Sequence, residues 1–164
     1  MHITDLLFFA VALFIHEAGH LLAARACGVN VMEFGLGWGR KLYGRRLGTV
    51  DYNLHALPIG AYVRLDIKEL QQKPLSQQVL VLLAGIFVNL AVAYATLGTR
   101  FSMLNLLLAA TNLLPLYQQD GWKCGMVCLR AILRRKSALV EWTFTIVGSA
   151  LSLIVFAAQA FRHS

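Results

Sequence analysis

The sequence of 164 residues has few charged residues and few cysteines for its length. Only 14% of the residues are charged, whereas about 25% is usual in soluble domains. The three cysteines form no CxxC pair, which excludes a disulfide-rich scaffold. The 13 glycines exclude a collagen-like chain, in which every third residue is glycine. Internal repeats and low-complexity segments are also missing from the sequence.

Hydrophobic residues are abundant instead. They make up 58% of the chain, above the level of about 45–50% in soluble domains, and the mean hydropathy is +0.62. A disordered chain is excluded, because disordered chains are polar. The length allows one domain over residues 1–164 and leaves no room for a second module of ordinary size. The composition therefore predicts a single integral-membrane domain.

Four apolar segments alternate with charged ones. A transmembrane helix needs roughly 20 apolar residues, so we expect four spans, at residues 6–27, 76–98, 101–117 and 140–161. The third is short and is expected to end in irregular backbone at Pro115. The first has no polybasic start and no small-residue cleavage site, and it carries ionisable residues near its end. We therefore do not expect it to be a cleaved signal peptide.

The basic residues are distributed unevenly around these spans. Of the 15 Lys and Arg, all but Arg100 and Arg162 lie in residues 25–75 and 117–141. Such segments face the cytosol in multi-pass proteins of the cell membrane, so both termini are expected to face outward. The net charge of +7 is therefore interpreted as orientation in a lipid bilayer, and nucleic-acid binding is not expected.

Residues 34–65 are predicted to form a small β-sheet at the membrane surface. Apolar and polar residues alternate from Val50 to Ala56, after a turn predicted at Gly44–Gly48. Pro58 and Gly60 are expected to break this arm before a further short strand over residues 61–65.

Residues 121–136 have apolar side chains at helical spacing and basic residues near their end. This pattern predicts an amphipathic interfacial helix. The predicted fold class is an all-α membrane protein, with about four transmembrane helices and a small membrane-associated β-hairpin or sheet between the first and second spans.

The first predicted span contains an HExxH motif, formed by residues His16 to His20. Four residues advance a helix by about 400°, so the two imidazoles project from one face. They can hold one Zn²⁺, and Glu17 beside them can take a proton from a water on the metal. An isolated charge within a span costs at least a few kcal/mol. Three ionisable groups there favour a metal site over a pair of packed histidines.

A catalytic zinc site needs a third protein ligand. Asp120 is the favoured candidate, because it follows the third span on the side where the HExxH helix ends. Gly121 after it allows a sharp backbone turn. A helix cap is the competing role for Asp120. His55, Asp51 and Glu141 are the other candidate ligands on this side of the membrane.

Two asparagines lie within predicted spans, where an amide must find hydrogen-bond partners. Asn89 either joins neighbouring helices or donates to a substrate carbonyl in the transition state. Asn112 either satisfies carbonyls freed by Pro115 or orients Asp120, and like Asn89 it is a candidate to contact the substrate. The sequence leaves these alternatives open.

Four separated segments together resemble the site-2 protease family of intramembrane zinc metalloproteases. They are FIHEAGHLLAA, FGLGWG followed by LPIGAYVRL, LAGIFVNLAVA and TNLLPLYQQDG. The resemblance implies a helical core that cuts a transmembrane protein substrate within the bilayer, with one zinc ion per chain. It implies His16, His20 and Asp120 as zinc ligands, Glu17 as general base and Asn89 near the scissile carbonyl. It also implies that the sheet binds substrate as an added strand.

The chain departs from the family's motifs at three positions, where Ile86 replaces a proline, Gln119 a leucine and Ala61 a glycine. None of these changes removes an implied ligand or the base. No PDZ or CBS regulatory domain is evident in the sequence, so control is expected from a membrane partner or from restricted substrate access.

Two alternative functions stay open, a membrane protein that binds zinc for transport or sensing and an inactive relative that acts as an adaptor. Glu17 discriminates a protease from a transporter, because only the protease requires a carboxylate beside the metal ligands that does not itself bind the metal.

Overall fold

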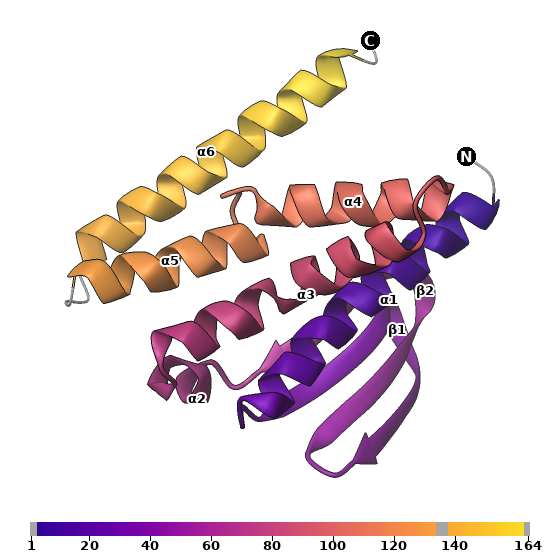
Figure 1. Cartoon of the computed structure of the whole chain (residues 1–164), viewed down its shortest axis with the longest axis horizontal. Coiled ribbons are helices and arrows are strands. Elements are labelled where there is room, and N and C mark those ends of the chain that lie inside the picture. Colours follow the sequence, from indigo (N-terminus) through magenta and orange to yellow (C-terminus); the bar gives the residue numbers. More distant parts are fainter. Residues whose placement is uncertain (1–2, 134–137, 163–164) are drawn as a thin grey trace.

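The computed structural model of the chain describes residues 3–133 and 138–162. Within these ranges the elements are α1 (Ile3–Ala26), β1 (Val31–Leu47), β2 (Val50–Leu65), α2 (Ile67–Gln72), α3 (Leu75–Ala95), α4 (Arg100–Leu113), α5 (Asp120–Leu133) and α6 (Ala138–Arg162). The sheet lies against α1, α3 lies between α1 and the pair α4 and α5, and α6 lies on the side away from the sheet (Figure 1). The chain is mostly helical with one small sheet, as predicted.

Helices α1 and α3 cross in close contact at two glycines. A Cβ atom added to Gly19 would lie 2.9 Å from the carbonyl oxygen of Ala84 and 3.1 Å from the Cα atom of Gly85. Small residues at such a crossing allow the two backbones to approach. Leu21 and Val81 lie in the buried core beside the crossing. The HExxH segment of α1 is therefore held directly against the backbone of α3.

Strands β1 and β2 form a two-stranded antiparallel sheet joined at residues 48–49. Both strands are long and bent, so that residues 33–36 lie between residues 51–54 and residues 61–64. Phe34 of β1 packs on Phe14 of α1, with ring centroids 5.4 Å apart. This contact places the sheet along the helix that carries the HExxH motif.

Two details of the predicted sheet are wrong. The turn is confined to Gly48 and Thr49, because Gly48 adopts a left-handed φ of 63° that allows a two-residue connection. The predicted break at Pro58 and Gly60 is absent, and β2 continues to Leu65. Strand pairs are recorded on either side of residues 58–60 and not within them. A proline is tolerated in a strand where no ladder hydrogen bond is required.

Two helices of the described residues are long and apolar enough to cross a membrane, Thr4–Ala26 and Leu75–Ala95. They correspond to the predicted spans 6–27 and 76–98. The third predicted span ends early, because α4 has 14 residues and stops at Leu113 before Pro115. At 1.5 Å per residue it is about 21 Å long, less than a hydrocarbon core of about 30 Å. The fourth predicted span lies in α6, whose described apolar part is Leu139–Leu153. The number four stays a prediction.

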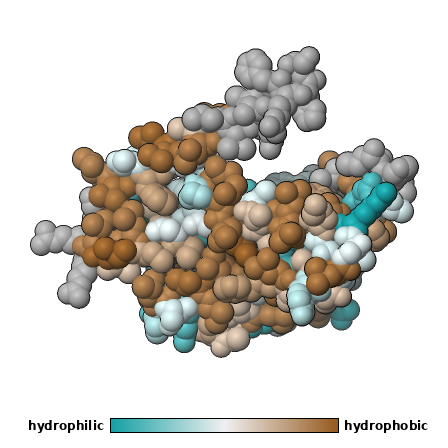
Figure 2. Space-filling view, turned by 45° about the horizontal axis from the view of Figure 1, so that its top comes forward, coloured by the Kyte–Doolittle hydropathy of each residue, from teal (hydrophilic) through white to brown (hydrophobic). Residues whose placement is uncertain are grey.

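Apolar side chains cover most of the face shown in Figure 2. Large exposed apolar residues occur on several helices, among them Phe87 and Leu90 of α3 and Leu107 of α4. Soluble monomers rarely expose a contiguous apolar patch larger than a few hundred Å². This surface supports association of the protein with a membrane.

Helix α2 was not predicted from the sequence. Asp66 caps it, since its side chain accepts hydrogen bonds from the backbone N–H groups of Lys68 and Glu69. The helix predicted over residues 121–136 corresponds to α5, which begins one residue earlier. Residues 134–136 of that prediction lie outside the described residues.

Helix α5 begins where the chain folds back on the end of α4. A Cβ atom added to Gly121 would clash with the backbone carbonyl oxygen of Leu113. Only a glycine allows this approach, which fixes the position of the neighbouring Asp120.

We expect Gly121→Ala to lower the free energy of unfolding by about 1–3 kcal/mol, because its methyl group forces two backbone segments apart. Gly125→Ala is the matched control on the same helix. The methyl group of that variant meets the ring of Phe144 at 3.0 Å, and a side chain can turn away. Thermal unfolding of both variants in detergent tests this expectation, which fails when the two variants unfold at the same temperature.

Candidate metal centre

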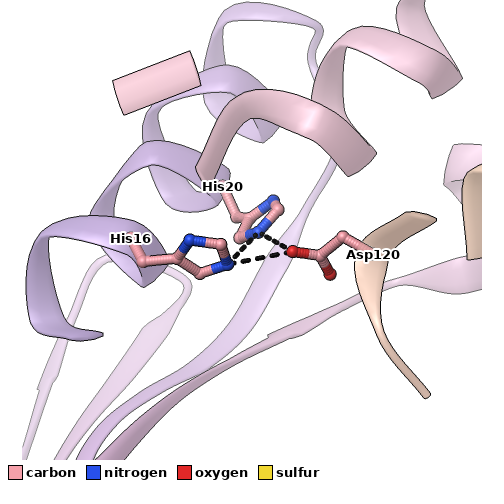
Figure 3. A group of neighbouring side chains, drawn as sticks. All are labelled: His16, His20 and Asp120. Atoms are coloured by element: carbon pink, nitrogen blue, oxygen red, sulfur yellow. Dashed lines mark hydrogen bonds and ion pairs between the residues drawn. The ribbon is translucent and has the colours of Figure 1, made fainter. Parts of the chain in front are cut away.

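Three buried side chains meet between α1 and the start of α5. Nε2 of His16 lies 2.9 Å from Oδ2 of Asp120, and Nε2 of His20 lies 3.0 Å from the same oxygen (Figure 3). The two Nε2 atoms are 3.2 Å apart. Each of the three residues is at most 5% exposed. Two imidazole nitrogens and a carboxylate oxygen thus converge on one point.

The helix geometry and a hydrogen bond to α3 orient the two imidazoles. His16 and His20 lie one turn apart on α1, and their ring centroids are 4.9 Å apart. Nδ1 of His20 donates to the carbonyl oxygen of Val81 at 2.7 Å, which leaves its Nε2 available to a ligand. Metal-binding histidines usually make such a bond with the nitrogen that does not bind the metal. Nδ1 of His16 is buried and has no hydrogen-bond partner among the described residues.

Helix α3 faces the two imidazoles with a residue that has no side chain. A Cβ atom added to Gly85 would lie 2.5 Å from Nε2 of His20 and 2.7 Å from Nε2 of His16. One turn further along α3, Asn89 is fully buried, and neither polar atom of its amide has a partner in the described part of the chain. Buried amides are nearly always hydrogen-bonded. This unpartnered amide is therefore a candidate to bind a ligand.

The cluster fits a zinc ion. Ligand atoms at about 2.0–2.1 Å from tetrahedral Zn²⁺ are about 3.3 Å from one another, close to the separations of 2.9–3.2 Å found here. Two nitrogens and one carboxylate oxygen form a donor set typical of catalytic zinc, which keeps its fourth position for water or substrate. The missing side chain at Gly85 leaves free space beside the two Nε2 atoms.

Glu17 lies next to the cluster and is not one of the three converging residues. It follows His16 directly in α1 and is partly exposed. A carboxylate beside the ligands is suited to act as a base on a bound water.

Lys123 of α5 contacts the cluster directly, although no sequence pattern singled it out. Its Nζ atom donates to Oδ1 of Asp120 at 3.0 Å. The available signal was the spacing, since residues three apart share a helix face. Burial opposes ionisation of Asp120, but its contacts with His16, His20 and Lys123 outweigh this effect and hold the pKa of its carboxyl below the usual range.

The structure places the other candidate ligands away from the cluster. His55 lies in the sheet, where Nδ1 donates to the carbonyl oxygen of Gly39 and Nε2 contacts the hydroxyl group of Tyr62. Asp51 also lies in the sheet, 3.9 Å from Arg46. Glu141 of α6 is paired with an arginine of α5.

The side chain of Asn112 is hydrogen-bonded within its own helix. Its amide donates to the carbonyl oxygen of Leu108, one turn earlier in α4. The recorded partners of Asp120 are His16, His20 and Lys123. Within the described residues, the side chains that hold Asp120 therefore come from α1 and α5 and not from Asn112.

Comparison with known proteins gives a family match. The sequence model of the family described as "Peptidase family M50" matches residues 4–102, more than half of the chain. The match includes the HExxH motif and Asn89 and ends before Asp120. The proximity of Asp120 to the two histidines is thus an observation independent of the match.

Similar relatives carry names of metalloproteases. The chain is 38% identical over 96 residues to "Putative zinc metalloprotease CPE1693" of Clostridium perfringens, which covers 54% of this chain and 29% of the relative. It is 32% identical over 117 residues to "Putative zinc metalloprotease NMA0084" of Neisseria meningitidis, which covers 62% of this chain and 26% of the relative. It is 34% identical over 98 residues to "Probable membrane metalloprotease ARASP2, chloroplastic" of Arabidopsis thaliana, which covers 52% of this chain and 22% of the relative. The chain thus matches less than a third of the length of each of these relatives.

We expect Gly85→Ala to lower the zinc content well below one ion per chain, because its methyl group fills the space at both Nε2 atoms. Gly125→Ala is the matched control, since it adds a methyl group inside a helix where it meets the ring of Phe144 and not an imidazole. Elemental analysis of the purified variants measures the zinc, and thermal unfolding reports any change of fold. A Gly85→Ala variant with the zinc content of the parent would contradict this assignment.

Proposed function

Because the chain belongs to peptidase family M50, we propose that it is a zinc-dependent endopeptidase that hydrolyses a peptide bond in or near the transmembrane segment of a membrane protein. The family match confirms the resemblance to site-2 proteases predicted from the motifs. The observation that carries the proposal is the convergence of His16, His20 and Asp120 on one buried point with Glu17 beside it.

The proposed chemistry divides between the metal and the chain. Zn²⁺ held by His16, His20 and Asp120 would polarise the peptide carbonyl and lower the pKa of a water. Glu17 accepts the proton of the attacking water and passes it to the leaving amine. The partial exposure of Glu17 supports this role, because hydrolysis requires water to reach the base.

We assign Asn89 as a donor to the substrate carbonyl. Its buried amide has no partner in the described residues, and it follows Gly85 by one turn of α3. A donor held in place without reorganisation stabilises the charge that develops on the oxygen.

Residues 61–65 pair with β1, and no strand partner lies on their other edge within the described chain. An extended substrate segment added at this edge would gain backbone hydrogen bonds.

We further propose that the protein lies in the cell membrane as a multi-pass protein with its site toward the cytosol. The apolar α1 and α3 support insertion, and Arg25 at the end of α1 follows the positive-inside rule. The HExxH residues lie in the half of α1 nearer to this end. A membrane regulatory partner is part of the same proposal.

Glu17 separates a protease from a zinc transporter, a zinc sensor or an inactive adaptor. We expect Glu17→Gln to retain zinc and fold and to lose about 10²–10⁴-fold in cleavage rate, because the isosteric amide cannot accept a proton. Co-expression with a panel of single-span membrane proteins, followed by immunoblotting for products, compares the variant with the parent. Near-parental cleavage by Glu17→Gln would remove the mechanism.

Asp120 and His55 are distinguished by a pair of alanine variants. We expect Asp120→Ala to lose stable zinc binding and cleavage, because it removes one of three ligands. His55→Ala changes a residue bonded within the sheet, so it is expected to keep zinc and at most to alter substrate preference. Zinc analysis and the cleavage assay are applied to both variants. Normal zinc in Asp120→Ala together with loss in His55→Ala would reverse the assignment.

A further inference from the structure

The two carboxylate oxygens of Asp120 have different partners. Oδ2 lies within 3.0 Å of both imidazole Nε2 atoms, whereas Oδ1 accepts a hydrogen bond from Nζ of Lys123 at 3.0 Å. The side chain of Asp120 is 7% exposed and that of Lys123 is 47% exposed. The ammonium group therefore reaches from the surface to a buried carboxylate and binds the oxygen that the histidines do not contact.

The position of Lys123 in α5 is not explained by helix stability. It lies in the first turn, where the partial positive charge of the helix N-terminus disfavours a cation. An ion pair of this spacing on a helix surface contributes little to helix stability. A partner for a buried carboxylate is a stronger reason for a lysine here, because an unpaired buried charge is strongly destabilising.

The contact also limits how Asp120 can bind a metal. A carboxylate coordinates a cation through one oxygen or through two. With Oδ1 occupied by Lys123, only Oδ2 is directed at His16 and His20. Catalytic zinc requires three protein ligand atoms and one open position. A second oxygen from Asp120 would take up that position.

We propose that Lys123 is a positioning residue that holds Asp120 so that it offers a single oxygen to the zinc ion. The inference rests on the proposed function, since it takes the three-residue cluster to be a zinc site. Groups that hydrogen-bond to metal ligands typically change metal affinity by about 10–100-fold. Lys123 acts through Asp120 and does not itself touch the metal.

The test compares zinc binding by Lys123→Met, Lys123→Arg and the parent chain in detergent. Lys123→Met keeps most of the aliphatic stem and removes the ammonium group, so we expect the Kd for zinc to rise by about 10–100-fold. Lys123→Arg keeps a charged donor and is expected to restore most of the affinity. Competition with a chromophoric chelator measures the Kd, and the visible spectrum of the Co²⁺-loaded protein reports a change in coordination.

Lys68→Met is the matched control, because it removes an exposed lysine from the first turn of α2, outside the cluster. Parent-like zinc affinity in Lys123→Met, or an equal loss in Lys68→Met, overturns the inference. If Lys123→Met unfolds at a lower temperature without metal, Lys123→Arg decides the test. A Lys123→Arg variant that is as stable as the parent but binds zinc more weakly also overturns the inference. A parent chain that binds no zinc removes the proposed function as well. A parent that binds zinc and cleaves, beside a Lys123→Met variant of unchanged affinity, removes this inference alone.

Discussion

The close approach of α1 and α3 is the constraint on which the candidate metal centre depends. At Gly19 and Gly85 the two helices have no side chains to separate them. The carbonyl oxygen of Val81 can therefore accept the hydrogen bond that fixes the ring of His20. The same approach leaves the space beside both Nε2 atoms free, because the facing residue is Gly85. A single larger residue at the crossing would affect the helix spacing, the orientation of an imidazole or the room for an ion.

Helix propensity opposes glycine in these positions, since a glycine inside a helix is less favourable than alanine by about 1 kcal/mol. Gly19 and Gly85 both lie within long helices. Tertiary contact must outweigh this local penalty. In a bilayer, helices associate through close packing and hydrogen bonds, because lipid is as apolar as the side chains. The crossing provides both kinds of interaction and also builds the site.

The sequence was informative where the chemistry is encoded by local spacing. The HExxH spacing places His16 and His20 on one helix face, and the structure has them there. The choice of Asp120 followed from the order of apolar segments, and the structure brings it to the two histidines. Gly85 and Lys123 were missed as parts of the site, because their contacts depend on how helices far apart in the sequence pack. The extent of β2 was also mispredicted, because the pairing of residues 61–65 with β1 is non-local.

The segment between α4 and α5 shows how irregular backbone is accommodated next to the site. Gln118 has a φ of 72°, which is uncommon for a residue other than glycine, and Pro115 cannot extend the helix. Non-helical backbone at membrane depth is tolerated where protein supplies its hydrogen bonds. The N–H group of Tyr117 donates to the carbonyl oxygen of Gly148 and to the hydroxyl group of Ser152, both on α6. Helix α6 places no ligand in the cluster within the described residues, yet it satisfies the backbone that delivers Asp120 to it. The candidate metal centre therefore depends on α6 through hydrogen bonding, although its donor atoms come from α1 and α5.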